Sequence, residues 1–128
     1  MKVKVTPSKV HGNVKIPASK SMAHRALICA SLSDGTSIVS NVTNSKDIEA
    51  TVGCMKALGA KIKQIDETTY EVTGTNLFKQ EGNITCNANE SGSTLRFLIP
   101  LAACTNAKVK FLGQGRLLQR PMDVYENE

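Results

Sequence analysis

The pattern of apolar and polar positions along the chain predicts alternating strands and helices. Short runs of alternating or branched apolar residues indicate strands, and longer runs with apolar residues at helical spacing indicate helices. The predicted strands span residues 2–6, 13–16, 36–42, 61–65, 69–73, 83–87 and 108–112. The predicted helices span residues 20–33, 44–58 and 91–104, with a further helix that begins after Arg120-Pro121. The order of these elements defines an α/β protein.

The same order of elements begins twice along the chain. From residue 13 it reads strand, helix, strand, helix, strand, strand, and it starts again at residue 83. We therefore expect one complete βαβαββ unit of roughly 60–70 residues and part of a second. The chain stops early in its last predicted helix, which suggests truncation of a longer chain.

Apolar coverage and two prolines lead to three further predictions about the helices. The helix over 20–33 is apolar on most sides, so burial on more than one side is expected. Pro100 should kink its helix or force a late start, because proline lacks the backbone N–H. Pro121 suits the first position of the last helix.

Composition narrows the function classes. Basic residues (16) exceed acidic ones (11) but are scattered, and aromatic residues make up only 4% of the chain, which argues against a surface that stacks nucleic-acid bases. The four cysteines, at positions 29, 54, 86 and 104, lack metal-ligand spacing, so structural thiols are expected rather than disulfides or zinc. No signal peptide or membrane-spanning run is recognisable, which predicts a cytoplasmic protein.

The most informative chemical motif stands at the start of the first helix. Lys20, Ser21 and Arg25 fall on its first turns, and Ser21 and Arg25 share a face. A helix N-terminus attracts anions through its free N–H groups and its dipole, and these side chains add two cations and a hydroxyl. The spacing alone also fits an ordinary helix start with a snorkelling arginine.

Two later segments also combine small residues with arginines in a way that could bind an anion. Glu90, Ser91 and Gly92 lead into a helix that carries Arg96, and Gly92 would let a ligand approach the backbone closely. By itself this segment is better explained as a capped helix with Arg96 as a surface cation. A glycine-rich loop that carries Arg116 and Arg120 follows the last strand, without the remainder of a dinucleotide fingerprint.

Three other polar residues lie near these motifs in the sequence. Asp47 starts the second helix as a favourable charge at its N-terminus, with a secondary role in holding Lys20 or Arg25. His24 is expected to be a polar helix residue near the mouth of the site, and His11 a turn residue.

Three segments together resemble the EPSP synthase (3-phosphoshikimate 1-carboxyvinyltransferase) family. They read GNVKIPASKSMAHRALICASL, NESGSTLRFLIPLA and GQGRLLQRPM. The resemblance implies the enolpyruvyl transferase fold, an inside-out α/β barrel with two domains of three βαβαββ units. Residues 1–18 would then be strands of the second domain, and residues 19–128 a truncated N-terminal domain.

The resemblance also implies an activity. The family transfers the enolpyruvyl group of phosphoenolpyruvate to the 5-hydroxyl of shikimate 3-phosphate, giving 5-enolpyruvylshikimate 3-phosphate and phosphate, without metal or organic cofactor. Its full-length enzyme is expected to be monomeric, without nucleic-acid or membrane partners. The family's catalytic carboxylates lie outside these 128 residues. The chain alone is therefore expected to be inactive.

Site residues follow from the same resemblance, position by position. Ser21 and Arg25 would bind shikimate 3-phosphate, and Lys20 would lie between the two substrates. The Gly92 backbone and Arg120 would bind phosphoenolpyruvate. Four further residues would support the site: Asp47, Glu90, Arg96 and Arg116.

Two alternatives remain open. UDP-N-acetylglucosamine enolpyruvyl transferases share the fold, but they have Lys-Asn in place of Lys20-Ser21 and a cysteine in the loop before their Arg-Pro, which this chain lacks. A non-catalytic anion-binding module is the second alternative.

The chain also departs from many family members at Glu90, where they have asparagine. A carboxylate beside an anion is unfavourable unless it braces a cation.

Overall fold

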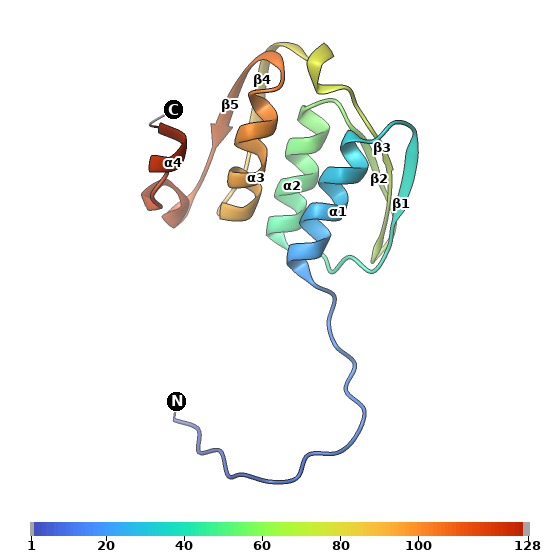
Figure 1. Ribbon diagram of the computed structural model, residues 1–128, viewed down its shortest axis with the longest axis vertical. Helices are drawn as coiled ribbons and strands as arrows, with labels where there is room; N and C mark the ends of the chain where they lie inside the picture. Colours follow the sequence, from blue (N-terminus) through green and yellow to red (C-terminus); the bar gives the residue numbers. More distant parts are fainter. Residues whose placement is uncertain (1, 127–128) are drawn as a thin grey trace.

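The computed structural model describes residues 2–126, and from residue 20 onward the chain folds into helices packed against two small sheets (Figure 1). The first sheet is antiparallel, and its central strand β3 lies between β1 and β2. The second sheet pairs β4 with β5 in parallel, and α3 connects the two strands. In chain order the elements are α1 (Lys20–Leu32), β1 (Thr36–Val39), α2 (Lys46–Ala57), β2 (Lys61–Asp66), β3 (Thr69–Thr73), a 3₁₀ turn (Leu77–Lys79), β4 (Glu81–Asn87), α3 (Gly92–Ala102), β5 (Asn106–Leu112), a 3₁₀ turn (Gly115–Gln119) and α4 (Asp123–Glu126).

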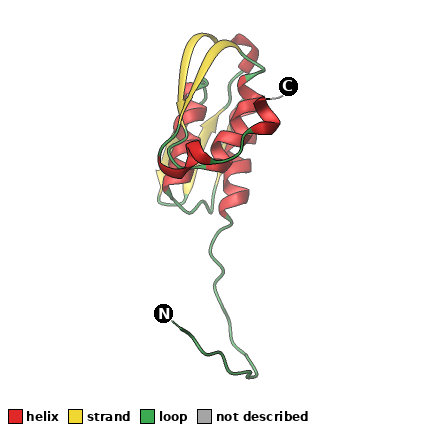
Figure 2. Cartoon of the chain, turned by 90° about the vertical axis from the view of Figure 1, so that its left-hand side faces the viewer, coloured by secondary structure: helices red, strands yellow, loops and turns green. Residues whose placement is uncertain are grey.

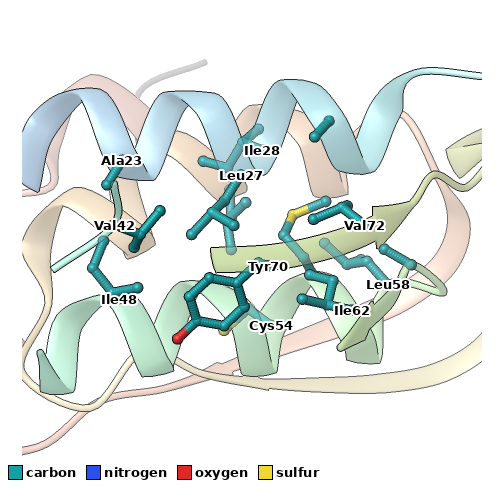
Figure 3. Packing of buried hydrophobic residues seen from close by; sticks show 14 of the residues in the cluster. Ala23, Leu27, Ile28, Val42, Ile48, Cys54, Leu58, Ile62, Tyr70 and Val72 are labelled. Atoms are coloured by element: carbon teal, nitrogen blue, oxygen red, sulfur yellow. The ribbon is translucent and has the colours of Figure 1, made fainter. Parts of the chain in front are cut away.

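The core lies between the helices and the first sheet (Figure 3). Leu27 of α1 and Ile48 of α2 are fully buried, and they share one apolar cluster with Tyr70 and Val72 of β3. The α2 helix also contacts β4 and α3, so it links the two sheets. Burying such large side chains stabilises the fold by about 1.5–3 kcal/mol each.

Local backbone chemistry sets the ends of these elements. Gly59, two residues after the end of α2, has a left-handed φ of 101°. Its N–H bonds to the Lys56 carbonyl, and the Ala60 N–H bonds to the Met55 carbonyl. This is the Schellman arrangement that glycine permits. The strand predicted to reach residue 42 ends at Val39 instead, since Asn41 has a φ of 58° and breaks the extended backbone.

The two strands predicted over 2–6 and 13–16 are absent from the structure. Residues 2–18 extend away from the folded part as an irregular segment (Figures 1 and 2). Every residue from 2 to 17 is exposed, and no described strand pairs with this segment. A strand needs a partner for its backbone N–H and C=O groups. The first unit therefore reads αβαββ here, whereas the second unit begins with a paired strand, β4.

Two helix predictions also need correction, and one of the two alternatives predicted at Pro100 is excluded. The α1 helix is buried on one side only, since Met22 is 62% exposed and Ala26 and Cys29 are exposed as well. The α3 helix shows no late start, and Pro100 lies inside it. The last helix begins at Asp123 rather than at Pro121, and an unpredicted 3₁₀ turn over Gly115–Gln119 precedes it.

Candidate functional site: an anion site at three helix N-termini

The N-termini of α1, α2 and α3 lie at the same end of the molecule (Figure 1). A serine caps each helix: the hydroxyls of Ser19, Ser45 and Ser91 accept N–H bonds from residues three positions further on, at 3.3, 3.3 and 3.2 Å. Parallel helix dipoles add their positive ends there, and each first turn keeps free N–H groups. This end of the molecule suits an anion.

The side chain of Lys20 joins the first two helix starts. Its ammonium group forms an ion pair with the Asp47 carboxylate in the first turn of α2. The Lys20 side chain is 51% exposed, so the ammonium remains accessible to a ligand. Asp47 thus pairs with Lys20, one of the two cations named for its secondary role.

Arg25 is held in place by two contacts. Its Nη1 donates a hydrogen bond to the carbonyl oxygen of Ser21 at 2.8 Å. Its guanidinium carbon lies 5.0 Å from the centre of the Phe97 ring, within the range of a cation–π contact. Arg25 and Ser21 are both exposed on the first turns of α1. Phe97 was not among the predicted site residues, because nothing in the spacing of α3 connects it with α1.

The predicted pair of Gly92 and Arg120 also meets in space. A methyl group built on Gly92 would overlap Nη1 of Arg120, so the guanidinium lies directly against the first residue of α3. Glycine is required for this approach. The contact brings a cation from beyond β5 to the buried N-terminus of α3.

Residues of α3 hold the segment that carries Arg120. Arg96 Nη2 donates to the Pro121 carbonyl oxygen at 3.4 Å. The Tyr125 hydroxyl donates to the Arg96 carbonyl oxygen at 3.1 Å. That carbonyl would bond to residue 100 in a regular helix, but Pro100 has no N–H to donate. Tyr125 thus satisfies the acceptor that the proline leaves free and docks α4 against α3.

Two hollows are lined by predicted site residues. One has a volume of about 450 Å³, and its lining includes Asp47, Glu49 and Glu90 with Lys46 as a cation. This lining is acidic, which makes the hollow itself unfavourable for an anion. Glu90 lies against Gly115, and no ion pair joins it to another described residue, so the expected bracing of a cation has no partner here. Arg116 and Arg120 line the second hollow, of about 310 Å³.

A buried chain of hydrogen bonds lies beneath the helix starts. His24 Nδ1 is 2.7 Å from Thr51 Oγ1, which is 2.7 Å from Thr94 Oγ1, which is 2.7 Å from Ser91 Oγ. The expectation that His24 lies near the mouth of the site is wrong, since it is 1% exposed. Burial lowers the pKa of His24, with the charges of Lys20 and Arg25 acting in the same direction and Asp47 opposing them.

The cysteines form no disulfide. Cys54 and Cys86 are buried and contact each other, whereas Cys29 and Cys104 are exposed. A hydrogen bond with the Cys86 thiol, together with burial, raises the pKa of the Cys54 thiol, so it stays protonated at neutral pH. This agrees with the predicted structural role for these two residues.

None of the helices in residues 2–126 is both long and apolar enough to span a membrane.

The fold and site together define an α/β domain with cations beside its helix N-termini. The sequence profile of EPSP synthase (3-phosphoshikimate 1-carboxyvinyltransferase) matches residues 4–125. The 3-phosphoshikimate 1-carboxyvinyltransferase of Clostridium perfringens (strain SM101) is 52% identical over 124 residues, which cover 97% of this chain and 29% of that protein. The protein of the same name from Clostridium kluyveri is 49% identical over 123 residues, which cover 96% of this chain and 28% of that protein.

A solved structure of EPSP synthase from Acinetobacter baumannii has the same fold over the matched part. Its TM-score with this chain is 0.78 at 20% identity, and the match covers 91% of this chain and 26% of that one. The chain belongs to the EPSP synthase family. It spans 29% of the length of the curated relative with which it shares 52% identity.

Proposed function

We propose that this chain is the part of an enolpyruvyl transferase that binds shikimate 3-phosphate and one side of phosphoenolpyruvate. Two contacts carry the proposal: the Lys20–Asp47 ion pair and the approach of Arg120 to Gly92, each at helix N-termini that lie at one end of the molecule (Figure 1). Membership of the family, and relatives named for this reaction, support the choice of substrates.

In this proposal the residues divide the two anions between them. Ser21 and Arg25 bind the phosphate of shikimate 3-phosphate, with the guanidinium oriented by Phe97. The N–H groups at the start of α3 and Arg120 bind phosphoenolpyruvate. Lys20 forms an ion pair with Asp47. It lies between the two substrates and stabilises the negative charge that develops during the transfer.

We also infer that the proton-transferring groups come from a part of the whole protein outside these residues. These 128 residues would then bind the substrates without turning them over. Residues 1–18 would pair with a second domain in the whole protein. The alternating valines of this segment support that role, since Val3 and Val5 are 72% and 85% exposed and unpaired.

Titration of the chain with three anions tests the proposal. We expect shikimate 3-phosphate to shift the backbone amide resonances of Ser21, Gly92 and their neighbours, at a lower concentration than UDP-N-acetylglucosamine or inorganic phosphate does. Preference for the UDP-sugar would favour the related transferase. Equal, salt-sensitive binding of all three would favour a general anion-binding module and overturn the proposal.

A further inference from the structure

We propose that His24, Thr51, Thr94 and Ser91 form a hydrogen-bond relay that holds the N-terminal turns of α1, α2 and α3 in the positions that anion binding needs. The four are positioning residues, and none of them touches the anion. The inference rests on the proposed anion site, but not on the identity of its substrates.

The contacts of the relay cross all three helices. His24 lies on α1, Thr51 on α2, Thr94 on α3, and Ser91 is the cap of α3. Thr94 Oγ1 also lies 3.3 Å from the carbonyl oxygen of Asp47, in the same turn of α2 that binds Lys20. The relay therefore ends on the two turns that carry Asp47 and Gly92.

Burial makes these contacts costly to break. The exposed fractions of the four residues are between 0% and 2%. A buried donor or acceptor left without a partner costs about 1–3 kcal/mol, so each member holds its neighbour in a defined place. A shift of one helix start by the length of a hydrogen bond would break the relay.

The unpaired ring nitrogen of His24 determines which group donates and which accepts in each hydrogen bond of the relay. Among the described residues, Nε2 is buried and has no hydrogen-bond partner. A bare acceptor is tolerated there better than an orphaned N–H, which places the proton on Nδ1. His24 then donates to Thr51, Thr51 donates to Thr94, and Thr94 donates onward to Ser91 or to the Asp47 carbonyl.

Protonation of His24 would break this order, because an imidazolium carries a second N–H with no acceptor. The charged groups that act on His24 are Asp47, which favours the imidazolium, and Lys20 and Arg25, which oppose it. Since burial dominates and lowers the pKa of His24, the unfolded chain takes up a proton below pH 6.5 before the folded chain does. Stability should thus fall as the pH drops from 6.5 towards the lowered pKa.

Two measurements on the 128-residue chain test the relay. The first is the ¹⁵N spectrum of the His24 ring between pH 5.5 and 7.5. The second is binding of inorganic phosphate to Thr51→Val, which removes the central hydroxyl, to Thr51→Ser, which keeps it, and to Ser31→Ala. Ser31 is a matched control, since its hydroxyl is buried and hydrogen-bonded like that of Thr51 but lies near the C-terminal end of α1.

We expect a neutral ring with its proton on Nδ1, and phosphate binding that is weakened about fivefold in Thr51→Val and restored in Thr51→Ser. Ser31→Ala should lower the melting temperature without changing phosphate binding. An Nε2–H ring or an imidazolium at pH 6.5 would overturn the relay, as would unchanged binding in Thr51→Val or equal losses in Thr51→Val and Ser31→Ala. If Thr51→Val does not fold, the wild-type ring spectrum decides. Failure of the substrate preference above would leave these results unaffected.

Discussion

The helix starts of α1 and α3 reach the same chemistry by different routes. Both begin with a serine whose hydroxyl accepts an N–H three residues on. The start of α1 is exposed and carries its own cations, Lys20 and Arg25. The start of α3 is buried at Ser91 and Gly92, and its cation, Arg120, arrives from beyond β5.

This difference separates a site made by local sequence from one made by the fold. At α1, helical spacing alone places the ammonium, the hydroxyl and the guanidinium on neighbouring turns. At α3, the absence of a side chain on Gly92 is what admits the guanidinium of Arg120. Substitutions at the α1 start should therefore affect anion binding through the charge they remove. Substitutions at the α3 start should affect it by moving the Arg120 guanidinium.

The largest effect is expected from removing the local cation. Lys20→Ala deletes a charged donor and leaves the Asp47 carboxylate unpaired beside the anion. Binding of inorganic phosphate should weaken about 20-fold, near the lower end of the range for hydrogen bonds to charged groups. Titration followed by amide shifts measures this. Lys56→Ala, in the last turn of α2, is the control and should bind as the wild type does. If phosphate binding weakened equally in both variants, the loss would come from the change in net charge and not from the position of Lys20.

A smaller loss is expected when the geometry at α3 is changed. Gly92→Ala places a methyl group where Nη1 of Arg120 lies, and the flexible guanidinium moves away. Phosphate binding should weaken about tenfold with little change in melting temperature. The matched control is Gly53→Ala inside α2, where a methyl group meets open space and should stabilise the helix by about 0.5–1 kcal/mol. Retained phosphate binding in Gly92→Ala would show that Arg120 does not serve the site.

The comparison also explains which features the sequence could predict. Helix periodicity and serine caps depend on neighbouring residues, and so α1, α2 and the hairpin of β2 and β3 were predicted to within a few residues. The motif at Lys20 is local in the same sense. The meeting of Gly92 and Arg120 was expected only through the resemblance to a family, because it joins residues far apart in the chain.

Features that need a partner in space were missed or wrong. The alternating pattern over 2–6 and 13–16 is that of a strand, but a strand forms only beside another strand, and none of those described pairs with it. His24 was misplaced because the burial of a helix face is decided by α2 and α3. Phe97 and the hydroxyls of Thr51 and Thr94 left no signal, since their contacts cross from one helix to another.

Loss of the two serine caps should differ by about 1 kcal/mol in the free energy of unfolding. Ser19→Ala removes an exposed cap and should cost at most about 1 kcal/mol. Ser91→Ala also leaves the buried Thr94 hydroxyl without one partner, so its cost should be about 2 kcal/mol. Urea unfolding of both variants measures the difference. Equal costs would mean that burial adds nothing to the α3 cap.

The smallest expected effect is a gain. Glu90 places a carboxylate beside the α3 helix start, against Gly115 and in the acidic lining that includes Asp47 and Glu49. Glu90→Gln keeps the shape of the side chain and removes its charge, so phosphate binding at low salt should tighten about threefold, and the gain should shrink as added salt screens the charge. Glu67→Gln, in the exposed turn between β2 and β3, should have no such effect. Weaker binding in Glu90→Gln would instead mean that the carboxylate braces a cation of the site, which would make the α3 start depend on local charge as the α1 start does.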